Sequence, residues 1–347
     1  MRTHIQNLLL ALVLLAGIQQ AAAQNLFVTE NTGIIEITPD GTQHSFATGL
    51  SPAALVFDKA GNLFVSDIGS GIIYEFTNGV AIAKGIFAAG LSQPGGLAFD
   101  SAGNLFEANH TSGSVFKFTT NGTPSLFASG FPNNSPFGLA INSADNVFVG
   151  DLNYGTGSFG NITKTTPDGT QSSFDNNHDL YSPEGLVFDH AGNLFVSDYN
   201  QHAIFEYTNG IASARGLFAS GFNIPVGLAF DNASNLYAAD LGDNKIYIFT
   251  NGLATAKGII ASGLTSPDFI AFAPNQTPTF NVSIKMFAGI ILNNGQIGSN
   301  YLIQATANLN SSNWTTLTNV TLPSNSYIYI DYSSYTNNQQ FYRVVMP

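Results

Sequence analysis

The sequence predicts an all-β protein that consists mainly of one repeated four-stranded unit, followed by a smaller β module. Short runs rich in Val, Ile, Phe and Tyr alternate with Gly, Asn and Asp turns, and no stretch keeps a helical period. Charged residues make up 9% of the 347 residues, against about 25% in ordinary globular proteins. Hydrophobic residues make up 44%, which is enough to form large apolar cores.

Residues 1–23 are predicted to be an export signal. Arg2 supplies the positive start, residues 8–18 form an apolar run, and residues 21–23 form a small-residue cleavage site. The run is shorter than the ~20 residues of a membrane-spanning helix. We expect a mature chain that starts at Gln24, has no transmembrane segment, and is periplasmic, exposed on the cell surface or secreted by a bacterium. A buried first helix is the alternative interpretation.

Residues 24–275 contain six copies of one phrase, which in its fullest form reads SPEGLVFDHAGNLFVSD. The copies are marked by prolines spaced by 42, 42, 47, 42 and 42 residues: Pro52, Pro94, Pro136, Pro183, Pro225 and Pro267. Each complete copy holds four strand-like runs, and its FDxxGN stretch supplies a tight hairpin between the first two. A four-stranded repeat of this length is typical of a β-propeller blade.

The two ends of this region complement each other. Residues 25–48 match strands two to four of a unit, whereas residues 266–275 supply only a first strand. Joining them in one sheet would remove two exposed strand edges. The sequence therefore predicts a six-bladed β-propeller with five continuous blades and one shared blade that takes three strands from one end and one from the other.

The repeated pattern P-x-G-L-A-F-D-x-x-G-N-L-F-V-x-D, followed by N-x-x-I-x-x-F and N-G, resembles the NHL repeat. Its wider relatives are the six-bladed propellers of the SMP-30/gluconolactonase type. The resemblance implies the fold, but this architecture carries many unrelated functions. In the lactonase-like relatives, metal ligands enter at P-N-G and P-D-G patterns.

Residues 276–347 are predicted to form a second domain, a small antiparallel β-sandwich with Trp314 in its core. The segments NLNSSNWTTLTN and QFYRVVMP resemble C-terminal modules of secreted proteins from environmental bacteria. A module that docks on a surface or glycan and a simple spacer both remain open.

The charge balance excludes several classes of function. The formal net charge is -12, so no basic patch is available to neutralise nucleic-acid phosphates. The chain has no cysteine, which excludes disulfides and thiolate metal sites. Residues 24–275 hold 21 acidic and 7 basic residues, a balance that disfavours polyanionic ligands and tolerates cations, neutral sugars or basic peptides. We therefore expect a small molecule, a sugar, or a peptide or protein as partner. We expect a monomer.

The variable residue of P-x-G is the first candidate for chemistry, because propeller first strands enter the central channel there. Its occupants in the six copies are Ala53, Gly95, Phe137, Glu184, Val226 and Asp268. The carboxylates of Glu184 and Asp268 are the candidate ligands of a divalent cation such as Ca²⁺, the one cofactor the sequence suggests. No Asn stands at any of these positions, so the metal set of the lactonase-like relatives is not reproduced.

The longer third unit supplies the candidate ligand-binding residues. Its extra loop, residues 152–161, carries Tyr154 and Phe159 as a stacking wall for a sugar or peptide. The approach to the fourth unit adds three more candidates, and the loop after it adds one: His178, Asp179, Tyr181 and His202. A His beside carboxylates can act in acid–base chemistry, whereas the alternative is a solvated loop with no such role.

Two recurring aspartates of the repeat, and one residue that departs from it, have structural interpretations. Asp58 and its equivalents are expected to cap the first hairpins, and Asp67 and its equivalents to anchor turns and neighbouring blades. Glu107 replaces an apolar residue, and we expect it to form a cross-strand pair with Lys117.

Three functions are consistent with these observations. The first is an exported propeller that binds its ligand through the loop face and channel mouth. The second is a metal-dependent sugar lactonase or related hydrolase, and the third is a structural cell-envelope protein. Whether the chain is an enzyme is left open, and its catalytic residues are unknown.

Overall fold

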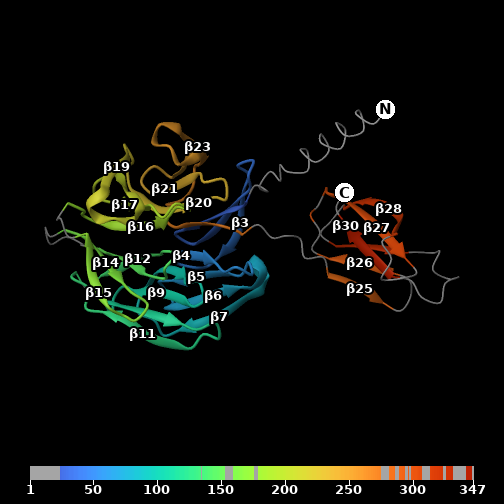
Figure 1. Ribbon diagram of the computed structural model, residues 1–347, viewed down its shortest axis with the longest axis horizontal. Helices are drawn as coiled ribbons and strands as arrows, with labels where there is room; N and C mark the ends of the chain where they lie inside the picture. Colours follow the sequence, from blue (N-terminus) through green and yellow to red (C-terminus); the bar gives the residue numbers. More distant parts are fainter. Residues whose placement is uncertain are drawn as a thin grey trace, which may run out of the picture. The chain divides into compact units, whose positions relative to one another are not determined.

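The chain forms two compact units, Met1–Asn275 and Gln276–Pro347, in a computed structural model. The structure describes residues 24–133, 135–152, 159–175, 179–274, 281–285, 289–293, 296, 298–306, 313–322, 326–330 and 341–345. Strands dominate both units (Figure 1). The predicted export signal lies outside the described residues. Within the described ranges, no helix has the length and apolarity that a membrane crossing requires.

The described residues of the first unit form six four-stranded antiparallel sheets. Sheet 1 consists of β24 (Ile270–Phe272), β1 (Leu26–Glu30), β2 (Gly33–Ile37) and β3 (Gln43–Thr48). Sheet 2 consists of β4 (Pro52–Phe57), β5 (Leu63–Asp67), β6 (Ile72–Phe76) and β7 (Lys84–Ala89). Sheet 3 consists of β8 (Pro94–Phe99), β9 (Leu105–Asn109), β10 (Ser114–Phe118) and β11 (Pro124–Ser129).

The remaining three sheets follow the same order. Sheet 4 consists of β12 (Pro136–Ile141), β13 (Val147–Asp151), β14 (Asn161–Thr165) and β15 (Gln171–Asp175). Sheet 5 consists of β16 (Pro183–Phe188), β17 (Leu194–Asp198), β18 (Ala203–Tyr207) and β19 (Arg215–Ser220). Sheet 6 consists of β20 (Pro225–Phe230), β21 (Leu236–Asp240), β22 (Lys245–Phe249) and β23 (Lys257–Ser262).

Sheets 2, 5 and 6 carry pairs of short 3₁₀ turns between their third and fourth strands. These are η1 (Thr77–Gly79), η2 (Ala81–Ala83), η3 (Thr208–Gly210), η4 (Ala212–Ala214), η5 (Thr250–Gly252) and η6 (Ala254–Ala256). The Asn of each TNG turn has a positive φ of 53° or 54°, a conformation that Asn tolerates better than most residues.

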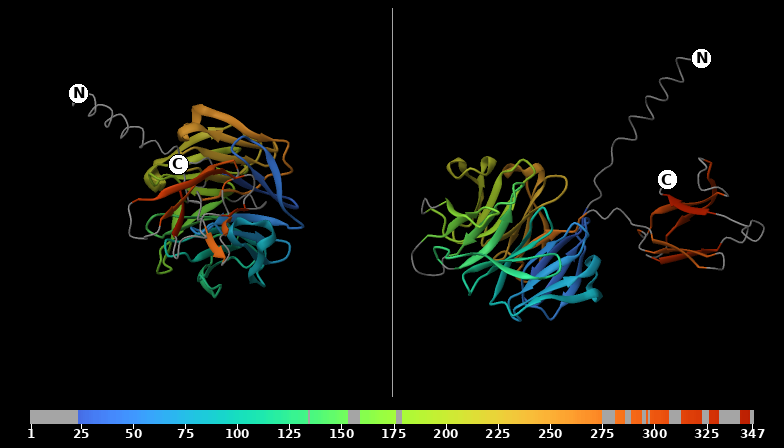
Figure 2. Two further views of the ribbon diagram at one scale, coloured as in Figure 1. Left: turned by 90° about the vertical axis from the view of Figure 1, so that its right-hand side faces the viewer. Right: turned by 60° about the horizontal axis from the view of Figure 1, so that its bottom comes forward.

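The six sheets surround a central channel, and their colour order is visible in Figures 1 and 2. The innermost strands contact one another in the closed order β4, β8, β12, β16, β20, β24 and again β4. This radial arrangement of four-stranded sheets is a β-propeller, the predicted architecture.

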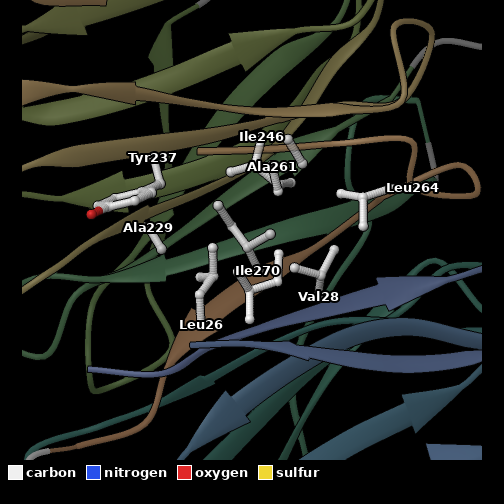
Figure 3. Close-up of a cluster of buried hydrophobic side chains, with 10 residues drawn as sticks. Leu26, Val28, Ala229, Tyr237, Ile246, Ala261, Leu264 and Ile270 are labelled. Carbon is white, nitrogen blue, oxygen red and sulfur yellow. The ribbon is translucent and has the colours of Figure 1, made fainter. Parts of the chain in front are cut away.

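The predicted shared sheet is present. β24 pairs with β1 in antiparallel register, with Phe272 opposite Leu26 and Ile270 opposite Val28. Leu26, Val28 and Ile270 pack in one buried cluster with Tyr237 and other residues of sheet 6 (Figure 3). Strands from the two ends of this region therefore close the ring, and burial of these side chains stabilises the closure.

The hairpin between the first two strands is held by the predicted aspartate. The Asp58 carboxylate accepts hydrogen bonds from the Asn62 backbone N–H at 2.7 Å and from the Asn62 side-chain amide at 2.8 Å. The Asn62 side-chain oxygen accepts a further bond from the Asn78 backbone N–H at 2.9 Å, which ties the hairpin to the TNG turn. Equivalent bonds join Asn193 to Asn209 and Asn235 to Asn251.

The second set of aspartates holds the chain segments that enter the sheets. The carboxylate of Asp67 accepts hydrogen bonds from the backbone N–H groups of Ser51 and Ser70, at 3.2 and 2.9 Å. Asp240 holds the backbone of Asn223 and Ile224 in the same way. Each such carboxylate lies in one sheet and fixes the connection from the sheet before it.

Aromatic side chains pack most of the seams between neighbouring sheets. The pairs, with their centroid separations, are Phe27–Phe57 at 5.1 Å, Phe64–Phe99 at 5.1 Å, Phe148–Phe188 at 5.0 Å, Phe195–Phe230 at 5.2 Å and Tyr237–Phe272 at 4.7 Å. All five are edge-to-face, the geometry that aromatic rings favour. The phenylalanine-rich composition is therefore used mainly between sheets.

The predicted ion pair between Glu107 and Lys117 is wrong. The register of β9 and β10 places Glu107 opposite Phe116 and Lys117 opposite Phe106. Because neighbouring residues of a strand point to opposite faces, the two charges lie on different sides of sheet 3. Lys117 pairs instead with Asp100, with 3.2 Å between Nζ and Oδ2. Glu107 is completely buried, and burial raises its pKa to about 8.

The described residues of the second unit form two three-stranded antiparallel sheets. One consists of β25 (Asn281–Lys285), β26 (Gly289–Asn293) and β29 (Ser326–Ile330), and the other of β28 (Thr315–Thr321), β27 (Asn300–Thr306) and β30 (Phe341–Val345). The expectation that Trp314 lies in the core is wrong. It is half-buried under Arg343, whose guanidinium lies 4.4 Å from the ring centroid, and the buried cluster is formed by Tyr301, Ile303 and their neighbours.

Candidate functional site

All the innermost strands begin at the same end of the channel, which we call the entry mouth. At this end, neighbouring innermost strands lie very close to one another. The glycines of the P-x-G phrases make this approach possible. A Cβ added at Gly96, Gly138, Gly185 or Gly227 would collide with the backbone oxygen of, respectively, Phe137, Glu184, Val226 or Asp268 on the next sheet. The repeated glycine therefore narrows the entry mouth, which explains why it recurs in the sequence.

Two phenyl rings meet across the entry mouth. Phe137 of sheet 4 and Phe269, at the start of β24 in sheet 1, have centroids 5.8 Å apart. Ala53, Ile68 and Leu152 pack in the same cluster. Because sheets 1 and 4 lie opposite each other in the ring, this contact crosses the channel. Apolar side chains thus obstruct the channel at its entry end.

The two candidate metal ligands lie at this mouth on different sheets. Glu184 of sheet 5 is buried, and burial raises the pKa of Asp268 of sheet 1 to about 7. Sheet 6, with Val226 at the equivalent position, stands between them. Among the residues that the structure describes, no group of three or more His, Cys, Asp or Glu side chains is placed to hold a metal ion. The divalent-cation site stays a prediction.

Two of the candidate ligand-binding residues are brought together near this mouth. The rings of Phe159 and Tyr181 lie 5.2 Å apart, and 45% of Tyr181 is exposed. The Gly160 N–H donates to the Leu180 oxygen at 3.0 Å, and the Asn133 side-chain amide donates to the Phe159 oxygen at 3.1 Å. The pair therefore stands on a hydrogen-bonded frame.

Tyr154 and His178, the other candidates of this stretch, lie outside the described residues. Asp179 forms an ion pair with Arg215 of β19. Arg215 also lies 3.5 Å from the buried carboxylate of Asp175, which accepts a hydrogen bond from the Tyr207 hydroxyl at 2.5 Å. Arg215 of sheet 5 thus contacts both β15 of sheet 4, through Asp175, and the connection that follows it, through Asp179.

The sequence interpretation missed this Arg215 cluster, although a signal was present. Tyr207 stands where sheets 2, 3 and 6 have Phe76, Phe118 and Phe249, and Arg215 stands where sheet 2 has Lys84. A hydroxyl and a guanidinium that enter the same repeat together indicate a buried polar contact.

His202 is held by the backbone. Its φ is 56°, and its ring Nδ1 contacts the backbone oxygen of Asn223 in the connection to sheet 6. This contact occupies one of its two ring nitrogens. An acid–base role beside the aromatic pair gains no support from this geometry, so the role of His202 stays a prediction.

The opposite end of the channel, which we call the exit mouth, holds a large cavity. The cavity has a volume of about 770 Å³. It is lined by the second halves of the innermost strands and opens between the FDxxGN hairpins. Its rim residues are Phe57, Phe99, Ile141, Phe188, Phe230 and Phe272. In the sequence, the sign of this cavity is the phenylalanine that recurs before the hairpin aspartates.

Comparisons with known proteins show the fold alone. No protein-family model matches the chain. No curated protein matches it either. A chain in the crystal structure of a nidogen/laminin complex is similar, with a TM-score of 0.65 and 17% identity, over 73% of this chain and 99% of that chain. A streptogramin B lyase structure has a TM-score of 0.50 and 17% identity, over 77% of this chain and 80% of that chain.

A third similar structure is virginiamycin B lyase from Staphylococcus aureus, with a TM-score of 0.48 and 15% identity, over 77% of this chain and 81% of that chain. The solved neighbours are β-propellers. They include a chain from a nidogen/laminin complex and a lyase, and at 15–17% identity they establish the fold of this chain and no more.

Proposed function

We propose that the chain is an exported binding protein of the NHL-like propeller type, which recognises its ligand on the entry face. The observation that carries this proposal is the pair Phe159–Tyr181, with rings 5.2 Å apart and Tyr181 45% exposed. An aromatic ring held in place on a polar loop provides a large contact area at a low entropic cost. Such a surface suits the apolar face of a sugar ring.

The charge of the propeller narrows the class of ligand. Residues 24–275 hold 21 acidic and 7 basic residues, and Glu184 and Asp268 lie at the same mouth as the aromatic pair. Negative potential repels anionic ligands and accepts neutral ones. A neutral saccharide is therefore the favoured ligand. Export is supported by the sequence pattern of residues 1–23.

Binding to an array of neutral oligosaccharides tests this function directly. We expect Tyr181→Ala to weaken binding about tenfold, taking as a guide the loss of about 1–3 kcal/mol when an aromatic ring that stacks on a nucleobase is replaced by Ala. The matched control is Leu217→Ala, which removes a 62% exposed side chain from β19 of the adjoining sheet. If Tyr181→Ala binds saccharides as well as the unchanged protein does, the aromatic pair is not the binding surface, and the proposal is wrong.

A second candidate function is a metal-assisted lactonase or related hydrolase. It is favoured by one observation, namely that Glu184 and an Asp268 with a pKa of about 7 enter the same mouth. Calorimetric titration with Ca²⁺ or Zn²⁺ separates this function from simple binding. Binding at micromolar affinity that is lost in Glu184→Gln would support the hydrolase, and no binding below millimolar concentration would dismiss it.

A further inference from the structure

The exit mouth holds a cavity that the proposed entry-face function does not use. The cavity there has a volume of about 770 Å³, inside the range of roughly 300–1,000 Å³ that small-molecule sites occupy. It extends inward as far as Phe269, one of the two rings that meet across the entry mouth. The cavity is therefore a funnel, open at one end and obstructed at the other.

The innermost strands give this funnel apolar walls, and its polar lining residues lie outside these strands. Each innermost strand contributes a Leu or Ile, then a Val or Ala, and then a rim Phe or Ile, as in Leu97, Ala98 and Phe99 of sheet 3. The same three-residue pattern reads Leu186, Val187 and Phe188 in sheet 5. Water in such a space gains few hydrogen bonds, so an apolar occupant that replaces it is favoured.

The rim is rigid before any ligand arrives. Phe57, Phe99, Phe188, Phe230 and Phe272 each pack edge-to-face against an aromatic ring of the neighbouring sheet, at 4.7 to 5.2 Å between centroids. Side chains fixed in this way lose little freedom when a ligand binds. The funnel is therefore a preformed site.

The charged groups at the rim of the funnel are engaged with their own neighbours. The carboxylates of Asp58 and Asp100 accept hydrogen bonds from Asn62 and Asn104, and Asp100 also forms an ion pair with Lys117 at 3.2 Å. The Lys59 ammonium donates to a backbone oxygen at 3.0 Å. A charged group inside the funnel would lose its water to apolar walls, and an anion would in addition meet a propeller with 21 acidic and 7 basic residues.

We propose that the exit-mouth funnel binds an uncharged, hydrocarbon-rich small molecule. The apolar wall supplies most of the affinity, and the net negative charge of the propeller disfavours fatty-acid-like anions. The entry face and the funnel then serve as separate sites at opposite ends of one channel.

Binding of the neutral dye Nile red to the mature chain, residues 24–347, tests the site. Ala98→Phe and Val187→Phe fill the funnel from sheets 3 and 5, and each is expected to raise the dissociation constant of the dye at least tenfold. The matched control is Leu126→Phe, which enlarges a 60% exposed side chain on β11, the outer strand of sheet 3, and leaves the constant within twofold. Melting curves confirm that each variant is folded.

Dye binding that survives both filling variants in folded protein, or no dye binding to the unchanged chain, would overturn the assignment. A competition experiment on the unchanged protein needs no variant. Oleyl alcohol is expected to displace the dye, whereas oleate, which has the same chain and a carboxylate, is expected to displace it at least tenfold less well. Equal displacement by the two would refute the preference for an uncharged ligand. Saccharide binding at the entry face is measured separately, so either proposal can fail alone.

Discussion

The two mouths of the channel are formed by the same six strands and yet differ in almost every physical property. At the entry mouth, glycines bring the backbones together, Phe137 meets Phe269 across the channel, and two carboxyl groups are present. At the exit mouth, the strands carry large apolar side chains and surround a cavity of about 770 Å³. One end is narrow and chemically varied, and the other is wide and uniform.

This difference follows from how repetition is distributed along the strand. The residue after each proline differs in all six copies, whereas the residue at the end of the strand is Phe in five of them. A ring of identical side chains makes a symmetric wall with no directional contact. A position that varies from copy to copy can place a single acid or aromatic ring. Selective recognition is therefore expected at the entry mouth and general apolar capture at the exit mouth.

The largest expected effect comes from forcing the entry mouth open. Gly138→Ala places a methyl group against the backbone oxygen of Glu184, so sheets 4 and 5 must separate. We expect a loss of about 4 kcal/mol or more in the free energy of unfolding, above the ~1–3 kcal/mol of ordinary overpacking, because backbone atoms must move. Urea denaturation measures the loss.

Gly216→Ala is the control for this variant. A Cβ at Gly216 of β19 meets no atom within 4 Å, and its backbone conformation does not require glycine. We expect a change of less than about 1 kcal/mol, in either direction. If the two alanine variants are equally stable, close packing at the entry mouth is not what distinguishes the two ends.

The next effect tests the obstruction between the two mouths. Phe137→Ala removes a ring that is 8% exposed and opens the channel from one end to the other. We expect a loss of about 3 kcal/mol, the low end of the ~3–5 kcal/mol for buried Phe→Ala, because the vacated space joins the channel. The variant should also bind Nile red with an altered emission wavelength, as water then reaches the inner end of the funnel.

Much of the fold was predictable because it is encoded in local chemistry. The Asp58–Asn62 hairpin and the missing first strand of sheet 1 can both be read directly from the repeated phrase. The predictions that were wrong depended on register and burial. Glu107 and Lys117 are neighbours in an aligned repeat, but a shift of one residue in the pairing puts them on opposite faces.

One part of the candidate site could be predicted from the sequence, and another could not. The sequence located Phe159 and Tyr181 on one surface, because a loop that interrupts a regular repeat must leave the sheet. The exit funnel was missed because each copy of its lining looks like ordinary core. Only the ring arrangement shows that the rim residues, from Phe57 to Phe272, face a shared space.

A smaller effect comes from a charge that lies at neither mouth. Glu107 is completely buried, and its pKa rises from an ordinary 4.5 to about 8 because of burial. The folded protein therefore holds a proton that the unfolded chain releases between about pH 4.5 and 8. The contribution of Glu107 to the free energy of unfolding is complete below about pH 4.5. It falls by about 1.4 kcal/mol per pH unit as the pH rises from about 4.5 to about 8.

Glu107→Gln removes this dependence, so its free energy of unfolding should decline less steeply between pH 5 and 8 than that of the unchanged protein. Urea denaturation at a series of pH values measures the slope. Glu75→Gln, a change at a partly exposed residue on β6, serves as the matched control and should keep the original slope. An identical slope in Glu107→Gln would mean that the buried acid is solvated, and that sheet 3 is looser between the two mouths than described.

The smallest effect concerns how the exit mouth is supported. Asn62→Ala removes two side-chain hydrogen bonds, the one its amide donates to Asp58 and the one its oxygen accepts from the Asn78 backbone, whereas Asn104→Ala removes one, the bond its amide donates to Asp100. The backbone bond from each Asn to its Asp can survive, so we expect losses of about 2 and 1 kcal/mol, in proportion to the side-chain bonds removed. Nile red affinity should change less than twofold in both, because the rim phenyl rings are fixed by their aromatic neighbours and not by the hairpins. A large loss of dye binding with little loss of stability would instead mean that the hairpins themselves close over the funnel, and that the exit mouth, like the entry mouth, depends on its loops.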